Sequence, residues 1–197
     1  MPTYEVEDLD DRENARIIKS AVSPRPIAWI STVDEEGVDN LAPFSSYNYV
    51  SSSRPVVLFN SPNADHGGLK DTAHNALETG EFAVNVVDEP LLEPMDATAA
   101  TLPPEESEFD FADVERAECE RIDPPRVADA AVTMECTLYD SVEIYDRITI
   151  FGEVVRFHVS EDVMTDGEID SRKLETVGRL GGPYYTVSEV AEFERRY

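Results

Sequence analysis

A succession of short segments rich in β-branched and aromatic residues, each followed by turn residues, constrains this chain more than any other feature. Residues 26–33 (P-I-A-W-I-S-T-V) lead through the turn D-E-E-G into residues 38–46, which predicts a β-hairpin. Because antiparallel strands in short succession favour closure, we expect a mainly β chain folded as a barrel with Greek-key-like connections, rather than a doubly wound parallel sheet. Further strands are predicted at residues 54–60, 82–87, 132–139 and 147–159.

Helical patterns are few and short. A helix is predicted over residues 69–79, where Gly80 is suited to end it, and a second, Pro-interrupted helix over 91–101. Residues 1–19 form an acidic leader, residues 102–131 an acidic insertion or lid with two Pro-Pro pairs, and residues 187–196 a short terminal helix. The 197 residues are long enough for one sizeable core, so we expect a single domain.

The charge balance is strongly acidic, with 16 Lys and Arg against 42 Asp and Glu and a net charge of −26. Such a chain lacks the basic face that nucleic-acid binding needs. At about 1 M salt the Debye length is roughly 3 Å, so self-repulsion of this size would be screened. Only three lysines occur against thirteen arginines, and we expect a protein of a salt-adapted cytoplasm. No signal core or apolar run of membrane-spanning length is present.

Cysteine and histidine usage points away from metal or hydrolytic chemistry. Cys119 and Cys136 form no C-x-x-C pair, Cys136 lies on the apolar face of a predicted strand, and His158 is expected to be solvated. The chain contains no G-x-S-x-G, H-E-x-x-H or G-x-G-x-x-G motif. We therefore expect no catalytic side chains and no metal site.

A Gly-rich loop, Asp65-His66-Gly67-Gly68, runs into Lys70-Asp71-Thr72 at a helix start, where free backbone N–H groups favour an anion such as phosphate. The alternative is that Asp71 or Thr72 only caps the helix and Lys70 is solvated. The Walker pattern is absent.

Two further stretches can meet a planar ring. N-L-A-P-F-S-S-Y-N, residues 40–48, offers backbone N–H groups and serine hydroxyls at a strand end. R-L-G-G-P-Y-Y, residues 179–185, offers paired glycines and two tyrosines that could stack on a ring, or simply a turn with half-buried tyrosines.

Six motifs in order resemble the flavin reductase-like family, the FMN-binding split barrels: S-P-R-P-I-A-W-I-S-T-V, N-L-A-P-F-S-S-Y-N, K-D-T-A-H-N, T-G-E-F-A-V-N-V, F-G-E-V-V and R-L-G-G-P-Y-Y. The resemblance covers about residues 20–185. It implies a homodimer of split β-barrels with FMN near the dimer interface. It further implies that residues 40–48 contact the isoalloxazine and ribityl chain, that Lys70-Asp71-Thr72 holds the phosphate, and that Arg25 meets the flavin or its phosphate. The cofactor-binding residues expected on this basis are Arg25, Ala42, Pro43, Phe44, Ser45, Ser46, Asn48, Asn60, Ser61, Lys70, Asp71 and Thr72.

One pair of residues departs from the pattern. Short reductases of the family carry Asp-His ahead of the strand that ends in I-G-E-V, whereas this chain has Asp146-Arg147. The expected activity is hydride transfer from NADH or NADPH to bound FMN and onward to an acceptor, with the cofactor carrying the chemistry. The alternatives are an FMN-binding electron carrier or storage protein with little NAD(P)H turnover, and a flavin-free interaction module.

Overall fold

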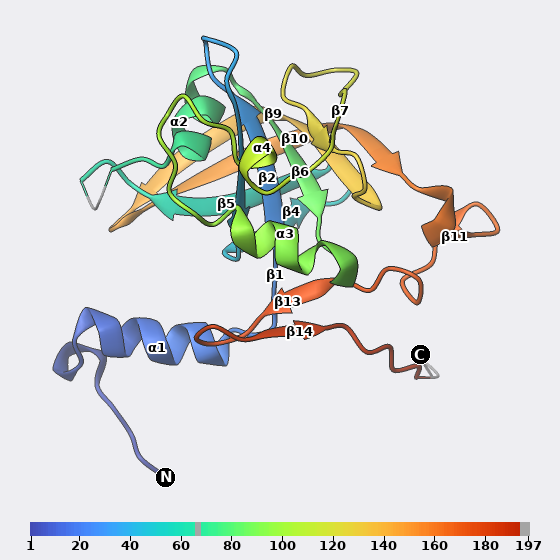
Figure 1. Ribbon diagram of the computed structural model, residues 1–197. Coiled ribbons are helices and arrows are strands. Elements are labelled where there is room, and N and C mark those ends of the chain that lie inside the picture. The colour runs from blue at the N-terminus through green and yellow to red at the C-terminus, as the bar shows by residue number, and fades with distance from the viewer. Residues whose placement is uncertain (66–67, 194–197) are drawn as a thin grey trace.

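A computed structural model describes residues 1–65 and 68–193, and its centre is a seven-stranded antiparallel sheet (Figure 1). The strand order is β3-β2-β6-β9-β10-β5-β4. The strands are β2 Ala28–Val33, β3 Asp39–Phe44, β4 Tyr47–Ser51, β5 Val56–Pro62, β6 Glu81–Val86, β9 Val132–Ile144 and β10 Arg147–Val159. The expectation of a mainly β chain with an antiparallel barrel is therefore confirmed.

The two edge strands of the sheet, β3 and β4, are neighbours in sequence. β3 and β4 are joined by a bend at Ser45 and Ser46, and the backbone N–H of Asn60 on β5 donates to the Ser46 carbonyl at 3.0 Å. A single strand was predicted over residues 38–46, whereas the chain bends at its end and continues as β4.

Alternate residues of these strands face inward and form the main core. Phe59 and Phe82 meet edge-on with ring centroids 5.4 Å apart, and Phe44 packs on Phe59 at 4.9 Å. Gly152 on β10 faces this cluster, where a Cβ atom would lie 2.3 Å from Cζ of Phe82. The glycine of the F-G-E-V motif therefore makes room for an aromatic ring.

A second core lies on the other side of β2 and β3. Trp29 is fully buried there beside Met95 and Phe109, and its indole N–H donates to Thr98 Oγ1 at 2.9 Å. The helices of this layer are α3 Leu92–Ala97 and α4 Glu108–Phe111, while α2 Asp71–Glu78 contacts β2, β3 and β6.

The segment 102–131 packs on the barrel through buried polar contacts. Glu108 Oε2 accepts from Asn40 Nδ2 at 2.8 Å and from the Leu41 N–H at 3.0 Å. Asn85 Oδ1 accepts from the Val127 N–H at 3.0 Å. These bonds satisfy groups that burial would otherwise penalise, and they hold the segment in place.

A separate layer lies below the barrel in Figure 1. There β1 Arg25–Pro26 pairs with β13 Val177–Arg179, which pairs with β14 Tyr185–Val187. Beside this sheet runs α1 Asp11–Ala21, which begins with a capping box in which Asp10 and Glu13 each accept the other's backbone N–H.

The terminal helix predicted over 187–196 is wrong for the described residues. Val187 pairs with Val177, and the Ser188 N–H donates to the Thr176 carbonyl at 2.9 Å, so this part of the chain extends a sheet. Residues 194–196 of that prediction lie outside the described residues.

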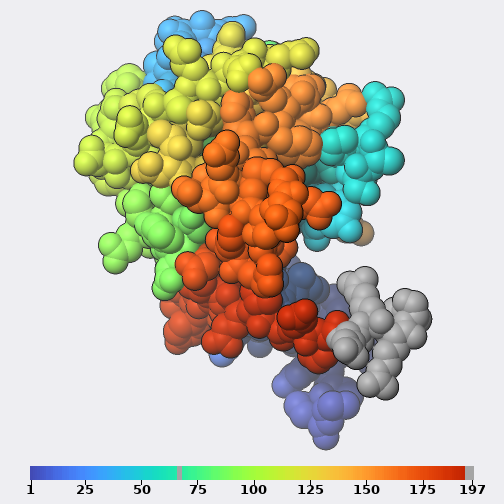
Figure 2. All heavy atoms as spheres, turned by 90° about the vertical axis from the view of Figure 1, so that its right-hand side faces the viewer, coloured from blue at the N-terminus to red at the C-terminus, as the bar shows by residue number. Residues whose placement is uncertain are grey.

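Smaller elements complete the chain. Figure 2 shows that the excursion after β10, in orange, covers one face between the barrel and the C-terminal layer. No helix in residues 1–65 and 68–193 is long and apolar enough to cross a membrane. The smaller helices and strands not yet named are η1 Val6–Asp8, η2 Glu89–Leu91, β7 Arg116–Ala117, β8 Arg126–Val127, η3 Glu161–Val163, β11 Met164–Thr165 and β12 Glu168–Ile169.

Candidate functional site

A groove of ≈ 750 Å³ opens where the barrel meets the layer of α1 and β13–β14. The bend between β3 and β4, the end of β5 and the β9–β10 turn form its barrel side. Its described lining residues are Lys19, Arg25, Phe44, Ser45, Ser46, Asn60, Pro62, Lys70, Ile144, Tyr145, Asp146, Arg147, Thr149, Arg179 and Gly182.

The groove concentrates positive charge in a strongly acidic protein. Five of the chain's 16 basic residues line it, including two of its three lysines, Lys19 and Lys70. Among the described lining residues Asp146 is the single acid, and it pairs with Arg147 at 3.0 Å. This charge distribution is suited to an anionic ligand. Cationic side chains in direct contact with a ligand attract it strongly, whereas salt screens the more distant acidic charges.

Six of the twelve predicted site residues line this groove together: Arg25, Phe44, Ser45, Ser46, Asn60 and Lys70. Asn60 is held in one orientation, since its Nδ2 donates to the Ser46 carbonyl at 3.2 Å and its Oδ1 accepts from Thr149 Oγ1 at 2.5 Å. The polar wall of the groove is therefore built before any ligand arrives, which lowers the cost of binding.

The other six predicted residues, Ala42, Pro43, Asn48, Ser61, Asp71 and Thr72, are not among those lining residues. Ser61 is fully buried, because β5 alternates and turns Ser61 inward with Val57 and Phe59 while Asn60 faces the groove. Thr72 is also buried, and its Oγ1 donates to Asn40 Oδ1 at 2.5 Å.

Asp71 lines a different hollow of ≈ 470 Å³, which runs along α2 and the β2–β3 turn. That hollow is acidic, with Asp34, Glu78 and Glu106 also in its wall, and His74 lies there too. Of the predicted Lys70-Asp71-Thr72 motif, only the lysine reaches the basic groove.

Arg25 is engaged with the protein itself. Its guanidinium donates to the carbonyls of Lys19, Val22 at 2.9 Å and Leu180 at 3.2 Å, and so joins the end of α1 to the turn after β13. Burial, followed by the charge of Arg179, lowers the pKa of Arg25 from its usual value.

Arg179 and Tyr185 account for the R-L-G-G-P-Y-Y motif. The Arg179 guanidinium donates to the Gly182 carbonyl at 2.9 Å and lies 4.4 Å over the Tyr185 ring. The Tyr185 hydroxyl donates to Asp96 at 2.6 Å. Tyr185 therefore stacks on an arginine rather than on a free ring, and the motif lines the groove through Arg179 and Gly182.

Sequence reasoning named neither Lys19 nor Arg179 as a site residue, nor Thr149. The scarcity of lysine was a usable signal for Lys19, as it was for Lys70. Arg179 and Thr149 become neighbours of Asn60 and Lys70 only through long-range pairing, which no local pattern reveals.

The chain matches known proteins along most of its length. The family model of the flavin reductase like domain matches residues 20–174. The structure of nitrilotriacetate monooxygenase component B from Bacillus cereus is similar, with 34% identity, a TM-score of 0.92, and 99% and 98% of the two chains covered. The 2-nitrobenzoate 2-nitroreductase NbaA of Pseudomonas fluorescens has 27% identity, a TM-score of 0.88, and 100% and 98% coverage.

A further structure, from Shewanella frigidimarina NCIMB 400 and described as having a split barrel domain, shares the fold with 23% identity, a TM-score of 0.85 and full coverage of both chains. The fold and groove thus define a split-barrel protein with a basic groove. The chain belongs to the flavin reductase-like family, and it is an oxidoreductase of flavin-related chemistry.

The Arg25 contacts predict a structural phenotype. We expect Arg25→Ala to destabilise the fold by roughly 1–3 kcal/mol, because three carbonyl contacts of a charged donor are lost at a partly exposed site. Denaturant unfolding measures this, and proteolysis within residues 11–22 should become faster. The matched control is Arg54→Ala, whose side chain is 82% exposed, and equal stability of the two variants would contradict the assignment.

Proposed function

We propose that the basic groove binds FMN and that the protein transfers a hydride from NADH or NADPH to the bound flavin, which passes electrons to an acceptor. The single observation that carries this proposal is the gathering of five cations around a pre-built polar wall in a chain of net charge −26. The FMN phosphate is dianionic, and the basic groove suits it better than any other surface hollow of the described residues does.

The residues fit the two ends of the cofactor. Lys70 and Lys19 would hold the phosphate, with Arg179 beside them, while the Ser45–Ser46 bend and Asn60 would hold the ring and ribityl chain. When bound, FMN supplies the redox chemistry, so the absence of an acid–base pair among the groove residues that the structure describes is no obstacle. The side chains bind, orient and exclude water.

Arg147 bears on which reaction occurs. It lines the groove at the position where the family resemblance places a histidine, and it would attract the phosphates of a nicotinamide cofactor. The loss of that histidine also favours a second candidate, an FMN-binding electron carrier with little NAD(P)H turnover. A flavin-free module is the third candidate, which a colourless purified protein that binds no FMN would support.

Anaerobic mixing of the FMN-loaded protein with NADH and, separately, with NADPH distinguishes the first two candidates. Hydride transfer predicts bleaching of the flavin absorbance on the timescale of turnover with at least one of them. Bleaching by dithionite but by neither nicotinamide cofactor would identify a carrier and overturn the reductase proposal.

The phosphate contact predicts a contrast between two ligands. Lys70→Ala removes a charge-assisted hydrogen bond worth about 1.5–3 kcal/mol, so the affinity for FMN should fall roughly ten- to a hundredfold, while riboflavin, which has no phosphate, should bind almost unchanged. Fluorescence titration at fixed molar salt measures both.

Lys173→Ala is the matched control, since Lys173 lies outside the groove and donates to the Met164 carbonyl at 2.5 Å. Equal loss of FMN and riboflavin in Lys70→Ala would indicate general damage, and no loss of either would remove Lys70 from the phosphate site.

A homodimer is also part of the proposal. The outer face of β4, β9 and β10 is largely apolar: Val50, Tyr139, Val142 and Phe151 line a hollow of ≈ 400 Å³ there, with Arg54, Asp140 and Glu153 also in its wall. This face continues to the groove through Ile144 and Tyr145, whose exposed fractions are 52% and 92%. A second copy would bury this surface and close the open side of the groove.

Light scattering in molar salt should give the mass of two chains, and Val142→Asp should give one chain with weakened FMN binding. A parent protein with only the mass of one chain would contradict the dimer.

The charge of −26 supports a salt-adapted cytoplasm as the working environment. Raising salt from about 0.1 M to 1 M shortens the Debye length from roughly 10 Å to 3 Å, and the melting temperature should rise accordingly. A melting temperature that does not change between these salts would contradict the inference.

A further inference from the structure

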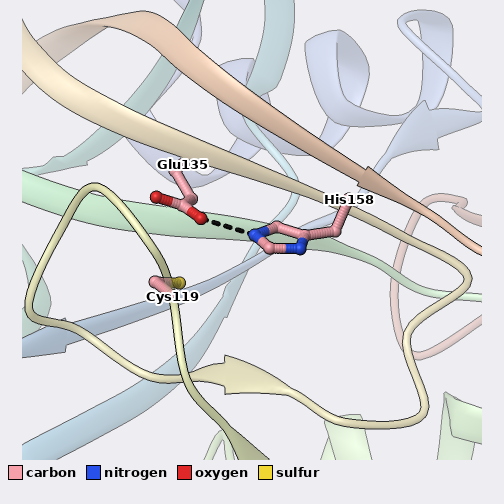
Figure 3. A group of neighbouring side chains, drawn as sticks. All are labelled: Cys119, Glu135 and His158. Atoms are coloured by element: carbon pink, nitrogen blue, oxygen red, sulfur yellow. Dashed lines mark hydrogen bonds and ion pairs between the residues drawn. The ribbon is translucent and has the colours of Figure 1, made fainter.

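Three side chains distant in sequence converge at the end of the barrel away from the groove. Cys119 Sγ, a Glu135 carboxylate oxygen and a His158 ring nitrogen all lie within 4.8 Å of one another (Figure 3). Glu135 lies on β9, His158 on β10, and Cys119 in the segment 102–131. His158, expected to be solvated, instead bonds Glu135 Oε1 through Nε2, and its side chain is only 19% exposed.

The Glu135 carboxylate is fully buried and held by the backbone. Its Oε1 accepts from the Glu120 N–H at 2.9 Å and its Oε2 from the Arg121 N–H at 2.7 Å. Burial alone would raise the pKa of Glu135, but these bonds and the one from His158 outweigh it and hold the pKa below its usual range. The site therefore keeps an oriented negative charge inside the protein, where a compensating cation is favoured.

Cys119 is the one member of the group without a partner. Within the part of the chain that the structure describes, no hydrogen bond reaches its half-buried thiol. Burial, together with the charge of Glu135, raises the pKa of Cys119 to about 12. Without a cation the group thus holds a protonated thiol beside an ionised carboxylate.

We propose that Cys119, Glu135 and His158 form a binding site for a divalent transition-metal ion, with Zn²⁺ as the best match. A thiolate, an imidazole and a carboxylate are the ligand types that zinc combines, whereas Mg²⁺ and Ca²⁺ take oxygen ligands. Two anionic ligands and a neutral histidine balance the 2+ charge, so the buried site becomes neutral. Binding releases the Cys119 thiol proton and moves the His158 proton to Nδ1, which leaves Nε2 free to ligate.

The geometry requires only small adjustments. Bonds of about 2.0–2.3 Å place tetrahedral zinc ligands roughly 3.3–3.7 Å apart, so the His158–Glu135 contact opens and Cys119 moves closer. The backbone donors from Glu120 and Arg121 remain as outer partners that orient the carboxylate. Because Cys119 is half-buried, water can supply the fourth ligand.

The ion would join the segment 102–131 to the sheet far from the flavin groove. Glu135 lies nine residues before Ile144 at the groove, on the order of 30 Å along an extended strand. The site is therefore independent of the FMN proposal, and its expected contribution is to stability.

Cobalt binding tests the site directly. Protein freed of metal by chelator dialysis and titrated with Co²⁺ in molar salt should bind one ion per chain and develop a thiolate-to-cobalt charge-transfer band. Cys119→Ser should abolish the band. His158→Gln should weaken Co²⁺ binding by more than roughly 10- to 100-fold, which is the loss expected when a residue that only hydrogen-bonds to a metal ligand is removed. Zn²⁺ should raise the melting temperature of the parent but not of Cys119→Ser.

His74→Gln is the matched control, because His74 lies in the acidic hollow where adventitious ions would gather, and it should behave as the parent does. Circular dichroism of metal-free Cys119→Ser establishes that this variant folds. The proposal is overturned if the parent develops no charge-transfer band with Co²⁺, if a folded Cys119→Ser retains the band, or if His74→Gln loses it.

Discussion

The bend at Ser45 and Ser46 joins the two edge strands of the sheet, and the groove depends on that turn of the chain. β3 and β4 stand at opposite ends of the strand order, and the bend carries the chain directly from one edge to the other. The hydrogen bond from the Asn60 N–H to the Ser46 carbonyl secures the bend against β5. The side-chain amide of Asn60 also donates to the Ser46 carbonyl, and this hydrogen bond forms part of the polar wall of the groove. One local bend thus both connects the two edge strands and shapes the groove.

The charge distribution is the second constraint. A net charge of −26 spread over the surface would repel a dianionic cofactor at low salt. The fold counters this by bringing Lys19 from α1, Lys70 from the start of α2 and Arg179 from β13 to one groove. In molar salt only such first contacts act on the ligand, so local placement outweighs the global balance.

Sequence patterns predicted the strands well where one face of a strand is buried. The alternation in β5 and the apolar run of β2 are of this kind. The glycine of the F-G-E-V motif is explained by the structure, because the Phe82 ring leaves no room for a side chain there. The helix α1 was missed although Asp10 and Glu13 supply a capping-box signal. The acidic composition of this stretch obscures the signal, and the helix buries none of its residues.

The groove was predictable in part. Ser45, Ser46 and Lys70 lie in the ordered motifs and Asn60 followed from the family resemblance, whereas the bend between β3 and β4 was not predicted. The orientation of Thr72 depends on how α2 packs, and a motif cannot reveal that its hydroxyl bonds Asn40. Arg179 reaches the groove only because β13 pairs with β1, and Cys119, Glu135 and His158 meet only through the pairing of β9 with β10 and the return of the segment 102–131. Contacts of this range are set by the tertiary fold rather than by local sequence.

A crystal structure of the protein grown with FMN in molar salt would test whether the basic groove binds the flavin. We expect the phosphate within hydrogen-bond distance of Lys70 and its neighbouring cations, with the ring beside the Ser45–Ser46 bend. Flavin bound elsewhere on the molecule, such as in the acidic hollow along α2, or a groove left without flavin at saturating FMN, would contradict it.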